Sequence, residues 1–171
     1  MKNKLKAELG KLPEDVQWHL RRSDGFLDLR MTARARAELD RIDEAWRGSP
    51  FYLNARMRLA FEEQDWKSAA DAARALADRM PGVADYLIQL AYATRRSDGI
   101  APAQFILEEA QKRFPDVAVI AFNLACYECQ EGRRARAMEH LQRAIKLDPH
   151  CRAMAMEDED LKPLWPMLEE A

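Results

Sequence analysis

Apolar residues recur along this chain at spacings of three and four, the pattern of a helix with one buried face. Two clear stretches are Tyr-Leu-Ile-Gln-Leu-Ala-Tyr-Ala at 86–93 and Ile-Ala-Phe-Asn-Leu-Ala-Cys-Tyr at 120–127. Turn signals follow them, Ser-Asp-Gly at 97–99 and Glu-Gly at 131–132. A second apolar-periodic segment then runs to a proline, which cannot continue a helix. The pattern predicts a unit of helix, turn and helix.

This unit repeats every 34 residues. Pro81, Pro115 and Pro149 stand 34 residues apart, and each closes an apolar-periodic segment. With each repeat numbered from Val16, three positions of the second helix share one face, because they lie four and three residues apart. They read Ala35, Ala69, Ala103 and Ala137 at position 20, Leu39, Ala73, Leu107 and Leu141 at position 24, and Ile42, Leu76, Ala110 and Ala144 at position 27. We therefore expect repeats at 16–49, 50–83, 84–117 and 118–151, with these positions in the core.

The repeats resemble the tetratricopeptide repeat. The fourth is the best match, with Leu124, Ala125, Gly132, Ala137, Leu141, Ala144 and Pro149 at family positions. The second departs at Arg56 and Met57, and the first is degenerate, with Arg47 in place of the terminal proline. End repeats are often modified because they face solvent. The resemblance implies an all-α fold, a right-handed superhelix of antiparallel helix pairs with a C-terminal capping helix.

Two segments lie outside the repeats. Residues 1–15 are expected to form a tail or a short helix. Residues 152–171 are expected to form a cap, because Leu161, Leu164, Trp165 and Leu168 have helical spacing after an acidic run at 157–160. We expect Trp165 to cover the apolar face of the last repeat, and a docking motif for another chain is the alternative.

Composition narrows the function. Among 171 residues, 27 Lys and Arg stand against 29 Asp and Glu, so the basic excess of nucleic-acid-binding proteins is absent. No apolar run is long enough to cross a membrane, and no secretory signal is recognisable. The odd cysteine count, three, favours reduced thiols and a cytoplasmic location.

The resemblance also indicates where a partner binds. In the family, positions 2, 5, 9, 12 and 13 of each first helix line a concave groove. We name these the groove positions. Together with the neighbouring Gln89, the residues expected to bind a partner are Phe51, Asn54, Arg58, Phe61, Ile88, Gln89, Tyr92, Arg95, Phe122, Cys126 and Cys129. Tyr92 and Phe122 are expected to form one apolar patch, flanked by Phe61 and Arg95. The predicted function is a non-catalytic scaffold that binds a peptide or helix of another protein.

Several alternatives stay open. In the first alternative, the chain's own N-terminal or C-terminal segment fills the groove. In the second alternative, the chain self-associates. The cations of the family's carboxylate clamp are missing, which disfavours binding of chaperone tails. A chaperone for a secreted or assembled client fits the size of the array.

An enzyme or a metal protein using the Cys-x-x-Cys of Cys126 and Cys129 is a further alternative. It is disfavoured because that spacing falls late in a helix and has no partner ligands. No catalytic or phosphate-binding motif is present, and no cofactor or metal is expected.

Overall fold

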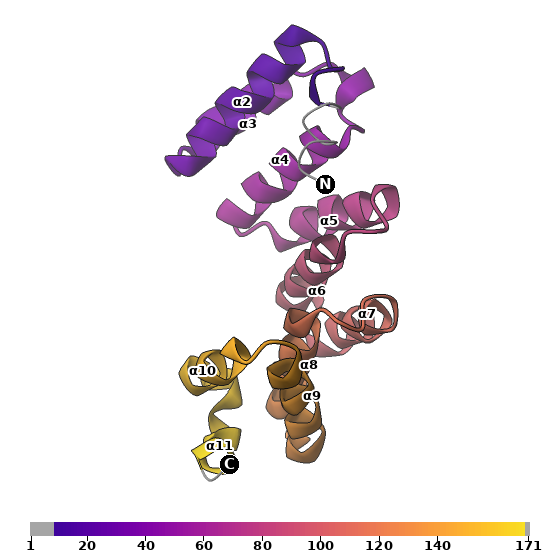
Figure 1. Cartoon of the computed structure of the whole chain (residues 1–171). Coiled ribbons are helices and arrows are strands. Elements are labelled where there is room, and N and C mark those ends of the chain that lie inside the picture. The colour runs from indigo at the N-terminus through magenta and orange to yellow at the C-terminus, as the bar shows by residue number, and fades with distance from the viewer. Residues whose placement is uncertain (1–8, 170–171) are drawn as a thin grey trace. The chain divides into compact units, whose positions relative to one another are not determined.

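The computed structural model describes residues 9–169, with the side chain of Glu169 left out, and this part of the chain is helical without a strand (Figure 1). The prediction of an all-α fold is confirmed. The chain forms two compact halves, residues 1–97 and residues 98–171. The N-terminal half contains α2 (Glu14–Asp28), α3 (Thr32–Asp40), the 3-10 helix η1 (Glu44–Trp46), α4 (Pro50–Glu62), α5 (Trp66–Arg79) and α6 (Ala84–Asp98). The C-terminal half contains α7 (Ile100–Arg113), α8 (Ala118–Gln130), α9 (Arg134–Leu147), α10 (His150–Glu157), the 3-10 helix η2 (Glu159–Leu164) and α11 (Trp165–Glu169).

The helix boundaries recur with the period of the sequence. The helices α4, α6 and α8 begin 34 residues apart, at Pro50, Ala84 and Ala118. Their successors α5, α7 and α9 each end two residues before one of the periodic prolines. Neighbouring helices pack in pairs, α2 with α3 and α4 with α5 in the N-terminal half, and α8 with α9 in the C-terminal half. No described helix is long and apolar enough to cross a membrane.

The three shared positions of the second helices form the core. All twelve residues at positions 20, 24 and 27 are buried, and Ile42, at 1% exposure, is the most exposed of them. Alanine at position 20 has no side chain beyond Cβ, so a neighbouring backbone approaches closely, and the leucines fill the remaining space. The prediction that these positions are in the core is confirmed.

The turns inside the repeats use left-handed backbone. Arg30 and Gln64 have φ of 56°, and Gly132 has φ of 77°, at the same repeat position. In the third repeat the residue with positive φ comes one position later. It is Gly99, with φ of 99° and ψ of −175°. A residue with a Cβ is strained at these Gly99 angles.

Replacing Gly99 with alanine is expected to lower the free energy of unfolding by about 1–2 kcal/mol, because an alanine at these angles strains the folded state and not the unfolded chain. Gly25, which lies inside α2 with nothing within 4 Å of an added Cβ, is the matched control. Gly25→Ala is expected to raise stability by about 0.5–1 kcal/mol. Urea unfolding of both variants checks the pair, and equal effects would contradict the assignment of strain to Gly99.

The first repeat closes differently from the others. Arg47, which stands where the periodic proline is missing, donates hydrogen bonds to the carbonyl oxygens of Ile42 and Asp40, each at 2.9 Å. These bonds satisfy carbonyl groups at the end of α3. Leu9 and Leu12 pack partly buried against the core of the N-terminal half. Part of the predicted tail therefore belongs to the fold, and residues 1–8 lie outside the described residues.

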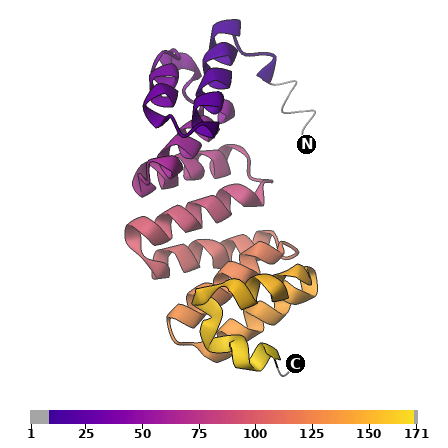
Figure 2. The same cartoon turned by 90° about the vertical axis from the view of Figure 1, so that its left-hand side faces the viewer.

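The C-terminal segment differs from the prediction of one capping helix. Pro163 falls inside η2, so the chain forms a 3-10 helix and then the short α11. Leu161, Leu164 and Leu168 are buried, whereas Trp165 is half-buried and donates from Nε1 to the carbonyl oxygen of Ala155 at 2.8 Å. Leucines rather than Trp165 form the buried face. In Figure 2 this segment, in yellow, lies over the helices of the C-terminal half, and η2 packs on α8.

Candidate functional site

The N-terminal half has a pocket on the face formed by its first helices, α2, α4 and α6. Its volume is about 200 Å³. The lining is Leu9, Leu20, Arg21, Asp24, Pro50, Phe51, Asn54, Ala55 and Tyr86. Leu20, Asp24, Phe51 and Asn54 all hold groove positions, and the structure brings them together. Most of the lining is apolar, with polar groups from Arg21, Asp24 and Asn54, a composition typical of binding pockets.

Tyr86 is a lining residue that the site prediction omitted. It stands at position 3 of its repeat, next to a groove position, and the family pattern does not assign position 3 to the groove. Ile88 and Gln89, which were predicted, are half-buried in α6 and do not line this pocket.

An ion-pair network borders the pocket. Arg58 of α4 donates from Nη1 to Asp24 at 2.7 Å and from Nη2 to Asp28 at 2.9 Å, both on α2. Burial raises the pKa of the Asp24 carboxyl, Arg58 opposes the shift, and Asp28 adds to it. The groove cation is therefore already paired within the chain, and its ion pairs join α2 to α4.

Three aromatic rings from α4, α5 and α6 meet in the same half. The centroids of Phe61 and Trp66 lie 6.1 Å apart, and the ring of Tyr92 lies 6.0 Å from each. Arg96 stacks over Trp66 and Tyr92 and donates from Nη2 to the Tyr92 hydroxyl at 3.1 Å. Tyr92 remains 39% exposed. We call these four residues the aromatic cluster.

The aromatic cluster agrees with the expectation that Phe61 lies beside Tyr92. Trp66 joins these two rings, and the arginine that stacks on Tyr92 is Arg96. The expected pairing of Tyr92 with Phe122, a residue of the other half, stays a prediction. Arg95, which was expected to flank the patch, is half-buried. Trp66 starts the second helix of its repeat, so it was not counted among the groove positions.

The predicted groove residues of the C-terminal half are covered. Phe122, Cys126 and Cys129 are 5%, 4% and 5% exposed. Since η2 packs on α8 and Cys126 Sγ lies 3.5 Å from Asp158 Oδ2, the C-terminal segment covers this face. The expectation that these three residues line an open groove is not met in this structure, because the chain fills the face itself.

The cysteines are free and buried. Burial raises the pKa of the Cys129 thiol, Arg134 opposes this, and Asp160 and Asp158 add to it. Burial likewise raises the pKa of Cys151. A raised pKa disfavours the thiolate that redox or metal chemistry needs. Among the described residues, no three Cys, His, Asp or Glu side chains gather to hold a metal ion.

Two glutamates are buried, although charged side chains in helices usually face solvent. Glu128, fully buried on α8, accepts from Gln104 at 2.9 Å and pairs with Arg133 and Arg136. Glu38, 4% exposed, lies 2.7 Å from His19 Nδ1 and 3.0 Å from Arg22 Nε. The hydrogen bond with His19 holds the pKa of Glu38 below its usual range, against the effect of burial. Both carboxylates link helices inside one half, which is a structural role.

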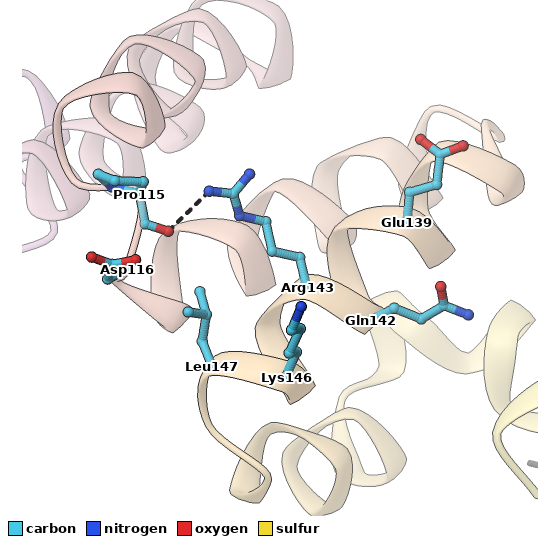
Figure 3. A pocket seen from close by; sticks show the side chains of 7 residues that line it. All are labelled: Pro115, Asp116, Glu139, Gln142, Arg143, Lys146 and Leu147. Atoms are coloured by element: carbon cyan, nitrogen blue, oxygen red, sulfur yellow. Dashed lines mark hydrogen bonds between the residues drawn. The ribbon is translucent and has the colours of Figure 1, made fainter.

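A larger depression, about 660 Å³, lies on the C-terminal half (Figure 3). Five lining residues come from α9, and Arg143 donates from Nη2 to the Pro115 carbonyl at 3.0 Å across it. Its charged residues are Asp116, Glu139, Arg143 and Lys146, two of each sign. The depression therefore favours neither an acidic nor a basic partner. Most of its lining comes from a second helix, and the groove positions belong to first helices.

Comparisons with known proteins bear on the fold. No family model matches the sequence, and no curated protein matches it. The structure is similar to a solved structure described as "MamA RS-1 ArsTM double mutant", a tetratricopeptide-like helical-repeat protein. The match has a TM-score of 0.70 and 13% sequence identity, and it covers 80% of this chain and 78% of the other. The tetratricopeptide-type helical fold is thereby supported.

Proposed function

We propose that this protein is a non-catalytic module that binds a peptide or a helix of another protein on the first-helix face of its N-terminal half. The observation that carries the proposal is the pocket between α2, α4 and α6, which gathers four groove positions at one place. Its volume of about 200 Å³ suits one large apolar side chain rather than an extended ligand.

The surroundings of the pocket support binding by burial. Phe51 and Tyr86 supply aromatic walls, and aromatic residues are enriched at protein interfaces. Arg21 and Asn54 offer donors, and Asp24 and Asn54 offer acceptors, for a partner backbone or a polar neighbour of the anchor residue. The buried thiols with raised pKa favour this reading over thiol chemistry. A reducing, cytoplasmic location is part of the proposal, because the described cysteines are free.

Asn54→Trp tests the proposal by filling the pocket without removing a core side chain. The variant is expected to lose partner capture from native extract by about tenfold or more, because the anchor side chain has nowhere to insert. Lys67→Trp places the same ring on an exposed position of α5 and is the control. Capture is quantified by mass spectrometry, and circular dichroism checks the helicity of both variants. Equal capture by both variants, with helicity retained, would contradict the proposal.

A further inference from the structure

The same groove positions are open in one part of this protein and covered in another. Positions 5, 9 and 12 of the second repeat are Asn54, Arg58 and Phe61, all half-buried. Those of the fourth repeat are Phe122, Cys126 and Cys129, all buried. The difference arises from residues 158–168, since η2 packs on α8 and Asp158 contacts Cys126. After burial, the charges of Asp160 and Asp158 at the start of the segment also raise the pKa of the Cys129 thiol.

The segment binds through one side. Leu161, Leu164 and Leu168 are buried, at spacings of three and four. Lys162 and Met167 face solvent. Leu161 and Leu164 lie in η2, which packs on α8, whereas Leu168 lies in α11, which packs on η2 and α10. Apolar anchors one turn apart are how short amphipathic segments fill a groove on a partner. The segment therefore has the form of a ligand.

The hydrogen bonds of α11 run to α10. Trp165 Nε1 donates to the Ala155 carbonyl oxygen, and Arg152 donates to the Leu168 carbonyl oxygen. Pro163 has no N–H to donate, and η2 and α11 have six and five residues. At the start of the segment, Asp158 accepts from Cys126 Sγ on α8, and the adjoining η2, which packs on α8, buries Leu161 and Leu164. A six-residue 3-10 helix has little stability of its own, so its place on α8 depends on the contacts that it makes there.

We propose that the first-helix face of the fourth repeat is a binding site for a short leucine-containing segment, and that residues 158–168 are its occupant in cis. The segment leaves the face as a unit, and the same sequence supplied in trans takes its place. This site is separate from the pocket of the N-terminal half, so either proposal stands or falls without the other.

Cys126 and Cys129 report on the cover, because both thiols are buried on α8, the helix on which η2 packs. In full-length protein, the double variant Leu161→Asp with Leu164→Asp is expected to release the segment. The rate of modification of Cys126 and Cys129 by Ellman's reagent should rise by about tenfold or more, assigned by mass spectrometry. Lys162→Asp with Met167→Asp changes the solvent side of the segment and should leave the rates unchanged.

The binding step is tested in trans. A synthetic peptide of residues 157–169, added in excess to the double leucine variant, should return both rates toward the wild-type values. A scrambled peptide of the same composition should give no protection. Equal protection by the scrambled peptide, or none by the native one, would overturn the proposal. Unchanged thiol rates in the double variant would also overturn it, since another element would then be the cover.

A measurement on the unchanged protein covers the case in which the leucine variant unfolds. In wild-type protein at rising urea, Cys126 and Cys129 should become reactive below the concentration that unfolds α9, monitored by amide hydrogen exchange. If the thiols become reactive only together with loss of α9 protection, the segment is an integral part of the core and the proposal fails.

Discussion

Replacing Leu141 with alanine is expected to lower the free energy of unfolding by about 2–5 kcal/mol. Leu141 holds position 24 in α9 and is fully buried. The substitution removes apolar contacts and leaves a cavity that the packed neighbours fill only in part. Urea unfolding monitored by circular dichroism measures the effect.

Leu147 is the control for this prediction, because it lies in the same helix and is 37% exposed. Leu147→Ala is expected to cost less than about 1 kcal/mol, because its side chain is already partly in water. If the two alanine variants lost the same stability, position 24 would not be a core position, and the repeat register would be wrong.

Replacing Ala137 with leucine is expected to cost about 1–3 kcal/mol, by the opposite mechanism. Ala137 holds position 20 of α9 and is fully buried. The pair α8 and α9 has no space there for a larger side chain, so the added atoms force the helices apart or the side chain into a poor rotamer. Ala103→Leu, at the same position of α7, is expected to behave alike.

Ala135→Leu is the matched control, since Ala135 is exposed on the same helix two residues away. Leucine and alanine are both good helix formers, so this change should move the melting temperature little. If the Ala137→Leu variant melted at the wild-type temperature, close packing at position 20 would be contradicted.

The core was predictable because its signal is periodic. Four alanines at position 20 and apolar residues at positions 24 and 27 recur at one spacing, and burial of these residues follows from the helix geometry. The turns were predictable at Gly99 and Gly132, where glycine marks a positive φ. The same conformation at Arg30 and Gln64 was not, since neither residue type favours it.

The site was less predictable because it depends on contacts between segments distant in sequence. The chain folds back after α10, so that η2 packs on the helix that carries Phe122, Cys126 and Cys129. The spacing of apolar residues does not tell in which direction the chain turns after α10. Arg58 looked like a free groove cation until the structure placed two aspartates of α2 beside it. Glu128 lies in a helix with buried residues on every side, and its arginine partners are Arg133, which precedes α9, and Arg136 in the first turn of α9.

Site-specific photo-cross-linking tests most directly whether the pocket of the N-terminal half contacts the partner. A photoreactive phenylalanine derivative is placed at Phe51, which lines the pocket, and separately at Phe105, which is 65% exposed on α7. In native extract, the residue at 51 is expected to cross-link to a discrete partner, and the cross-link should disappear when Asn54→Trp is added. Cross-linking of that partner from position 105 but not from position 51, in folded protein, would contradict the claim.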